Sequence, residues 1–171
     1  DKTTAAPAGF TPAYSLTGLV AGDTDASLSN TAAVYNDKDV RDASRITVSD
    51  LAVTGITGSN SSAATDYQLS ATSKEVSARI TSKIILVSGL TAATRDYNGG
   101  TSATLSGTAA IAGGATNSSD GLYYTGDAVT LSGTAAGSFT DKNVGSNKTL
   151  SLTGLSISGT DVDAGNYVLG S

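Results

Sequence analysis

The chain has 171 residues, 39% of them hydrophobic, and a formal net charge of −5, so it can bury one core or two small ones. Its ten Lys and Arg residues are scattered singly, which argues against nucleic acid and against an anionic membrane surface as partners. The longest apolar run, KIILVSGL, is far shorter than the roughly 20 residues of a membrane-spanning helix, so we expect no membrane span.

Several residue types are missing. The chain contains no Cys, His, Met or Trp, and its single Glu is Glu75. Catalytic triads built on His, thiolate nucleophiles, and zinc or copper sites made of His and Cys are therefore excluded. Disulfides are excluded as well, so an extracellular form would depend on strand pairing and small-residue packing. Thr, Ser, Ala and Gly make up over half of the chain, a mixture that disfavours long helices.

Short runs of alternating apolar and polar residues, bounded by Gly, Asn, Asp or Ser, predict strands along the whole chain. In chain order we expect strands at residues 13–16, 26–29, 44–55, 66–72, 75–81, 83–88, 103–106, 122–125, 127–132, 148–158 and 166–169. Within 148–158, the alternation of Leu and Ile with Ser and Thr changes phase at Gly154, which predicts a bend or bulge there. No window of ten or more residues has a helical period, so the sequence predicts an all-β fold.

The two halves of the chain repeat each other at a spacing of about one hundred residues. The aligned pairs are Gly22-Asp23 with Gly126-Asp127, Asp37-Lys38 with Asp141-Lys142, and Asp66-Tyr67 with Asn166-Tyr167. We therefore predict two tandem modules, residues 1–82 and residues 83–171. The strand number and the turn spacing favour two Ig-like β-sandwiches, with a β-grasp-like fold or a β-solenoid as the alternative. We find no repeat of the 20 to 30 residues that a solenoid needs.

The order of motifs in the second half resembles the bacterial YDG domain. Tyr97-Asn98-Gly99 stands where the Tyr-Asp-Gly of that family belongs, and DKNVG (141–145) and DAGNY (163–167) follow it. The first half departs from the pattern, since Asp39 and Arg41 replace the Asn and Gly of the DKNVG motif. YDG domains are repeat modules of very large secreted surface proteins, many with filamentous-haemagglutinin-like export. The resemblance implies an extracellular repeat of an adhesin or fibre at the bacterial cell surface, with no activity attached to particular residues.

A polar cluster, Asp141-Lys142-Asn143, precedes the strand predicted at residues 148–158. These side chains could hold a sugar or an ion. Asp and Asn also close turns by accepting hydrogen bonds from nearby backbone, and the Gly that follows permits the return of the chain. Because the cluster recurs at Asp37-Lys38 in the first half, we favour a turn.

Acidic residues at alternate positions are the only candidate metal ligands. Calcium binds such oxygen ligands, and the candidate pairs are Asp23 with Asp25 and Asp161 with Asp163. On a strand, Asp161 and Asp163 would share one face. None of the clusters has a twelve-residue loop that ends in Glu, so ordinary turn aspartates are the alternative. We predict no other cofactor.

Tyrosines offer the alternative binding chemistry. Tyr97, Tyr123 and Tyr124, beside Asn98 and Asp120, could form a platform on which a sugar ring stacks. Adjacent residues of a strand point to opposite faces, so we expect either Tyr123 or Tyr124 to be exposed as a contact residue. By contrast, Tyr67 and Tyr167 recur at equivalent positions before a Leu, which favours a place in the core.

Three function classes compete. The first is a non-catalytic structural and adhesive module, whose partners are neighbouring modules or subunits of the same protein. The second is a carbohydrate-binding module for host or matrix glycans. The third, a glycan-cleaving enzyme using two Asp, has the least support because no pair of strand-end carboxylates stands out from the turn aspartates.

The two modules also differ in their predicted strands. The first has no counterpart of residues 83–97, and the second has no counterpart of residues 71–82. A sheet edge left without its strand exposes unpaired N–H and C=O groups, which proteins normally pair or cover. We therefore expect the missing strands to come from neighbours in a longer array or from other subunits by β-strand addition.

Overall fold

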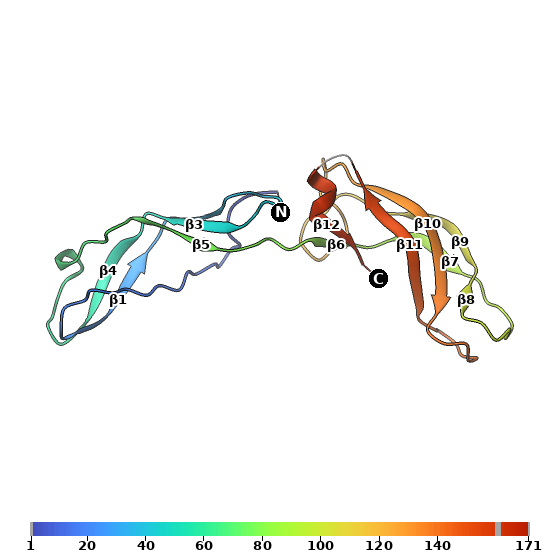
Figure 1. Ribbon diagram of the computed structural model, residues 1–171, viewed down its shortest axis with the longest axis horizontal. Coiled ribbons are helices and arrows are strands. Elements are labelled where there is room, and N and C mark those ends of the chain that lie inside the picture. Colours follow the sequence, from blue (N-terminus) through green and yellow to red (C-terminus); the bar gives the residue numbers. More distant parts are fainter. Residues whose placement is uncertain (1, 160–161, 171) are drawn as a thin grey trace. The chain divides into compact units, whose positions relative to one another are not determined.

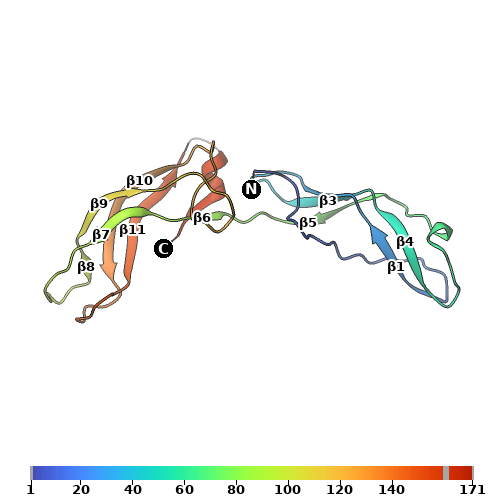
Figure 2. The same cartoon turned by 180° about the vertical axis from the view of Figure 1, so that it is seen from behind.

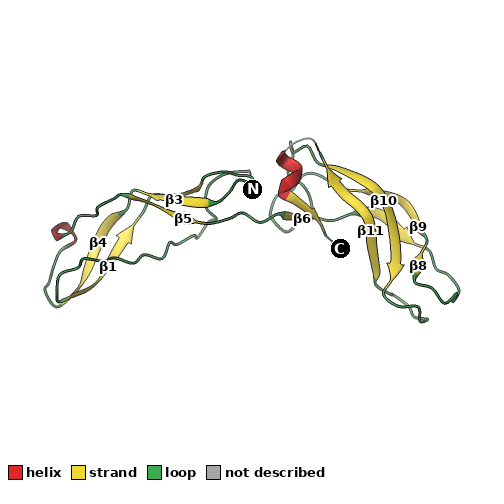
Figure 3. Cartoon of the chain, in the orientation of Figure 1, coloured by secondary structure: helices red, strands yellow, loops and turns green. Residues whose placement is uncertain are grey.

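The computed structural model describes residues 2–159 and 162–170, and it divides into two compact units at residues 80 and 81 (Figure 1). Strands dominate both units. Among the described residues the helical segments are two short 3-10 turns, η1 (Ala64–Asp66) and η2 (Val162–Asn166) (Figure 3). The predicted all-β class is confirmed. No described helix has the length and apolar character needed to cross a membrane.

The first unit is built on a long antiparallel ribbon. Its strands are β1 (Asp23–Ser29), β2 (Ala32–Tyr35), β3 (Arg45–Ser49) and β4 (Ala52–Gly58). Ser29 faces Ala52 and Ala32 faces Ser49, so β1 and β2 continue each other along one side of the ribbon, and β3 and β4 along the other. β5 (Ser73–Ser77) adds a third strand beside β3. The buried side chains at this end of the unit are Ala43, Ile46 and Val48.

The second unit contains the same ribbon, formed by β10 (Thr130–Phe139) and β11 (Leu150–Ser158), seen from behind in Figure 2. In β11 the Leu and Ile side chains are half-buried and the Ser and Thr between them are exposed, as the alternation predicts. The register shifts between Gly133 and Ala136, opposite Gly154, which confirms the predicted irregularity. A Cβ atom on Gly154, whose φ is +80°, would lie 2.2 Å from the carbonyl oxygen of Thr134. Only glycine fits this close approach of two backbones.

Five further strands complete the second unit. They are β6 (Lys83–Ile85), β7 (Ser88–Ala92), β8 (Ser102–Ala103), β9 (Leu105–Ala110) and β12 (Tyr167–Leu169). β6 runs parallel to β12, β7 pairs antiparallel with β9, and β8 pairs with β10. The core centres on Ile85, which is 0% exposed, together with Val129 and Tyr167.

Within each unit, a backbone hydrogen bond occurs at an equivalent position. The N–H of Tyr35 donates to the carbonyl of Thr4 at 2.6 Å, and the N–H of Phe139 donates to that of Thr101 at 2.8 Å. A short segment thus borders the ribbon at the same place in each unit. The repeat aligned in the sequence is therefore a repeat of structure.

Some predicted strands are absent. Residues 13–16 and 66–72 form no strand, and residues 122–125 contain only an isolated bridge between Tyr123 and Gly113. Conversely, β2 and β7 are strands that the sequence did not predict, because neither AAVY nor SGLTA alternates apolar with polar residues. The Ig-like packing of the sheets stays a prediction.

Candidate functional site

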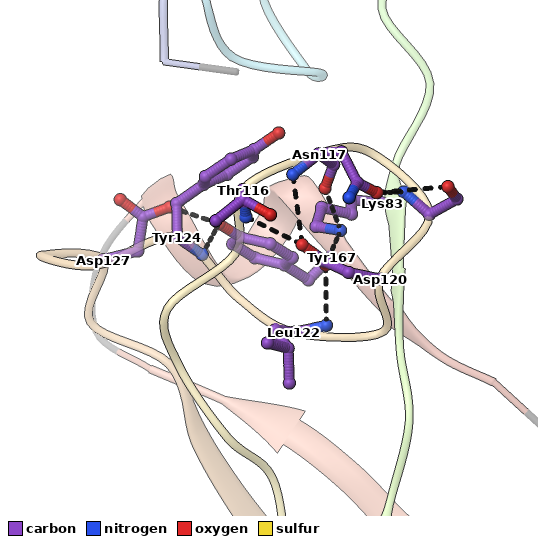
Figure 4. Close-up of polar contacts among 9 residues, drawn as sticks. Lys83, Thr116, Asn117, Asp120, Leu122, Tyr124, Asp127 and Tyr167 are labelled. Atoms are coloured by element: carbon purple, nitrogen blue, oxygen red, sulfur yellow. Dashed lines mark hydrogen bonds and ion pairs between the residues drawn. The ribbon is translucent and has the colours of Figure 1, made fainter.

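Each unit holds a tyrosine hydroxyl against an aspartate at the start of its ribbon, an arrangement we call the Tyr–Asp clamp. In the second unit the hydroxyl of Tyr167 donates to Oδ2 of Asp127 and accepts the N–H of Tyr124 at 3.0 Å (Figure 4). In the first unit the hydroxyl of Tyr67 donates to Oδ2 of Asp23 at 2.5 Å and accepts the N–H of Val20 at 3.2 Å.

The same tight turn presents the aspartate in both clamps. The N–H of Asp23 donates to the carbonyl of Val20 at 3.0 Å, and the N–H of Asp127 donates to that of Tyr124 at 3.2 Å. The residue before each aspartate is a glycine at positive φ, +103° at Gly22 and +90° at Gly126. Glycine adopts this conformation without the steric cost that other residues incur, which explains the repeated Gly-Asp pair.

Both clamp tyrosines, and Asp23, have shifted pKa values. Burial, and then the hydrogen bond to Asp127, raise the pKa of Tyr167 well above its ordinary value. The hydrogen bond to Asp23 raises the pKa of Tyr67, and the same bond lowers the pKa of Asp23. A hydroxyl donor on a charged acceptor forms a strong hydrogen bond, and in the first unit this bond moves the pKa values of both partners away from neutral pH.

Beside the clamp of the second unit lies a largely buried ion pair. Nζ of Lys83, on β6, donates to Oδ1 of Asp120 at 2.7 Å and to the carbonyl of Asn117 at 2.8 Å (Figure 4). The two charged side chains are only 8% and 16% exposed. Nζ also lies 5.6 Å from the centre of the Tyr124 ring, within the range of a cation–π contact.

Asp120 also organises the loop that carries it. Its Oδ2 accepts the backbone N–H groups of Thr116 at 2.7 Å and Asn117 at 3.1 Å, and its Oδ1 accepts that of Leu122 at 3.1 Å. Lys83 first, and then these N–H groups, hold the pKa of Asp120 well below its ordinary range despite the opposing effect of burial. The ion pair thus ties β6 to the loop before β10.

Sequence reasoning named Asp120 only as a neighbour of the sugar platform and did not find Lys83. The two residues are 37 positions apart, and nothing in the local pattern links them. The clamp left a clearer signal, because Gly-Asp and the later Tyr recur in both halves.

The structure does not bring the predicted platform together. Tyr97 is 61% exposed in the loop between β7 and β8, at the end of the β7–β9 pair where Ala92 meets Leu105. The other end of that pair is where Ser88 meets Ala110. Tyr123 and Tyr124 come after that end in the sequence, and they pack against the core around Ile85. Both are half-buried, so the prediction that one of them is exposed is wrong. They lie outside any extended strand, and strand alternation therefore does not apply to them.

Asn98 belongs to the loop of Tyr97 and is used within it. Its Oδ1 accepts the N–H of Gly100 at 3.0 Å and a guanidinium N–H of Arg95. This pattern closes the loop, as Asn commonly does in turns. Tyr97 is left as the exposed tyrosine among the three of the predicted platform.

The first predicted pair of calcium ligands is also separated. A bulge at Thr24 breaks the alternation of β1, so Asp23 is buried in its clamp while Asp25 is exposed and accepts the N–H of Ala26. Asp161 lies outside the described residues, and Oδ2 of Asp163 accepts the N–H of Ala128 at 3.5 Å. Within the described ranges, no three acidic side chains gather as a metal site would require.

The polar cluster after β10 is a turn, as predicted. Oδ1 of Asp141 accepts the N–H of Asn143 at 2.7 Å, and Lys148 closes the loop by donating to the carbonyl of Asn143 at 2.7 Å and to the carboxylate of Asp141. In the first unit Asp37 accepts the N–H of Asp39 at 2.9 Å in the same way.

Comparison with family models matches the YDG domain over residues 81–171, which is more than half of the chain. No match is found among curated proteins or among solved structures. The matched residues include the whole described second unit, with its clamp, its largely buried ion pair and its Asx turn. The chain belongs to the YDG domain family.

Proposed function

We propose that this chain is a non-catalytic structural and adhesive repeat of a bacterial secreted surface protein or extracellular fibre. The observation that carries the proposal is the Tyr–Asp clamp, built from the same atoms in both units. The two clamps join residues 44 and 40 positions apart by a bond to a charged acceptor. Such bonds fasten the segment that follows each ribbon back to the start of that ribbon without disulfides, which suits an exported repeat.

The position of β6 and β12 also supports a structural role. These strands lie near the two ends of the second unit and run parallel, with Lys83 beside Tyr167 and Ile85 beside Leu169. Tension applied through residues 82 and 170 would shear this pair, so its hydrogen bonds would bear the force together. The Lys83–Asp120 ion pair holds β6 to the loop under the same tension.

The proposal is tested by locating the protein. Antibodies raised against the purified chain should label intact source cells at the surface or along filaments, in immunogold electron microscopy. Label confined to the interior of sectioned cells would contradict the proposal. Turnover of a polysaccharide by the purified chain would contradict its non-catalytic part.

Carbohydrate binding is the second candidate, and the exposure of Tyr97 favours it. A Tyr side chain that is 61% exposed offers a flat apolar face with a polar tip, which suits a sugar ring. Glycan-array binding that is lost in Tyr97→Ala, and retained in Tyr14→Ala, would support this function. Binding that survives Tyr97→Ala, Tyr123→Ala and Tyr124→Ala would contradict a role for these tyrosines.

A further inference from the structure

The first unit has a groove, lined mainly but not wholly by apolar side chains, beside its Tyr–Asp clamp. Its volume is about 90 Å³, and its lining includes Leu16, Leu19, Ala26, Val53, Tyr67 and Leu69. These side chains come from the segment before β1, from β1 and β4, and from the segment after η1. All of them are half-buried, and the buried side chains of this unit's core belong to other residues.

In the second unit the equivalent place is filled. The clamp tyrosines align Tyr67 with Tyr167, and the ribbons align Ala26 with Val129 and Val53 with Ile157. Val129, Tyr167 and Ile157 pack around Ile85, which is 0% exposed. Ile85 of β6 thus occupies, in the second unit, the space that is open in the first.

The backbone shows the same difference. In the second unit Leu169 lies beside Ile85, and the N–H of Gly170 donates to the carbonyl of Ile85 at 2.8 Å. In the first unit residues 67–69 are not part of any strand in the described ranges. The N–H of Ser70, the counterpart of Gly170, makes no backbone hydrogen bond to a described residue. Among the described residues of the first unit, nothing therefore takes the position of the Ile85 side chain or pairs with residues 67–69 as the β6 backbone pairs with β12.

We propose that this groove is a docking site for an extended strand of the β6 type, donated by another YDG repeat. The strand lies parallel to residues 67–69 and inserts an aliphatic side chain at the place that Ile85 occupies in the second unit. The donor is another repeat because the chain's own β6 is held by β12 and by Asp120. This inference rests on the proposed structural role and names the contact through which repeats join.

The lining also defines the chemistry of the donor. Leu16 stands where the second unit has Asp120, and none of the described residues that line the groove is acidic, so a residue like Lys83 would find no carboxylate among them. The donor therefore needs no Lys at its first position. It needs one aliphatic side chain that faces the groove, as Ile85 does in the second unit, where the neighbouring Ile84 and Leu86 are each 54% exposed. Main-chain bonds then give affinity and the inserted side chain sets the register.

Disulfide trapping tests the site on the full chain, which contains no cysteine of its own. The probe is a synthetic peptide of residues 81–92 that carries Ile84→Cys. Gln68 is exposed and stands where Val168 pairs with Ile84, so the chain variant Gln68→Cys should cross-link to this peptide. The matched control is Val168→Cys in the second unit, a position that is 48% exposed and already paired with β6.

We expect at least tenfold more cross-linked product with Gln68→Cys than with Val168→Cys at equal peptide concentration. A peptide that also carries Ile85→Asp should lose this product, because a carboxylate cannot enter the mainly apolar groove. Equal trapping by the two chain variants, or trapping that is insensitive to Ile85→Asp, would overturn the proposal.

A second arm identifies the donor. Copies of the chain carrying Gln68→Cys are mixed with copies carrying Ile84→Cys, and we expect no cross-linked dimer. A dimer would overturn the assignment to another repeat and assign the strand to a second copy. If antibodies label the cell surface but the peptide is not trapped, the docking site is rejected and the proposed function stands. If the peptide is trapped but the cell surface is not labelled, the proposed function is rejected and the docking site stands.

Discussion

Tyr167 and Tyr67 make the same hydrogen bonds in different surroundings. Tyr167 is 7% exposed and belongs to the core cluster, whereas Tyr67 is half-buried and lines the open groove. Burial is accordingly the main cause of the raised pKa of Tyr167, while the hydrogen bond to Asp23 is the main cause for Tyr67. The same clamp is therefore protected from water to different degrees in the two units.

Removal of the clamp hydroxyl should destabilise the second unit. Tyr167→Phe keeps the ring and deletes the donor to Asp127, so we expect the free energy of unfolding to fall by about 2 kcal/mol, typical of a hydrogen bond to a charged group. Urea denaturation followed by circular dichroism measures the change. Tyr97→Phe, at an exposed position, is the control and should change stability by less than about 0.5 kcal/mol. Equal effects of the two substitutions would contradict a structural role for the clamp.

The Lys83–Asp120 pair predicts a dependence of stability on pH. The folded-state pKa of Asp120 lies below its value in the unfolded chain, about 3.9. Its contribution is therefore complete above that value and is lost as the pH falls through the folded-state pKa. We expect the free energy of unfolding to decrease from about pH 5 to pH 2, and Asp120→Asn to flatten part of this decrease. Urea midpoints measured at several pH values test this, and an unchanged slope in Asp120→Asn would contradict it.

At the scale of elements, both ribbons bend at a residue with positive φ. The second unit has Gly154 at +80°, and the first has Asp50 at +55°, whose carboxylate accepts a hydrogen bond from the Thr31 hydroxyl. Asp tolerates this conformation better than most residues, and Gly tolerates it best. The bend is thus kept in both units with different side chains.

Gly154→Ala should destabilise the second unit by about 2 kcal/mol or more, because the new Cβ would adopt a left-handed conformation and collide with backbone. Gly145→Ala is the matched control in the adjacent turn, where a Cβ would lie at an ordinary 3.7 Å from the Lys148 side chain. The measurement is again the urea midpoint. If both variants unfold at the same midpoint, the close approach at Gly154 is not a constraint.

The sequence predicts an element well when large side chains alternate. β11 was predicted with its bend because Leu and Ile mark one face. β2 (AAVY) and β7 (SGLTA) were not predicted because their apolar and polar residues do not alternate. Residues 66–72 alternate like a strand yet form none, because strand formation needs a partner and the described residues supply none beside residues 67–69. The Lys83–Asp120 pair was not predicted for a related reason, since tertiary contacts across 37 positions leave no local pattern.

At the scale of the whole chain, the two units share a ribbon, a clamp and an Asx turn but differ in which edge is covered. In the first unit β5 pairs with β3. In the second unit β11, the counterpart of β3, lies at the edge of its sheet as far as the described residues show. The second unit pairs β6 with β12, and the first leaves residues 67–69 outside any described strand. Each unit therefore has one open edge at the place where the other unit has a paired strand. This arrangement is expected of repeats that join by strand addition.

Amide hydrogen exchange of the isolated chain tests this account most directly, because it compares one position in the two units. The N–H of Gly170 donates to the carbonyl of Ile85 at 2.8 Å, whereas its counterpart at Ser70 makes no backbone hydrogen bond to a described residue. We predict that Gly170 is protected from exchange and that Ser70 exchanges at nearly the rate of an unstructured amide. Equal protection of Ser70 and Gly170 would contradict the account, because it would mean that the first unit already has its own strand in the groove.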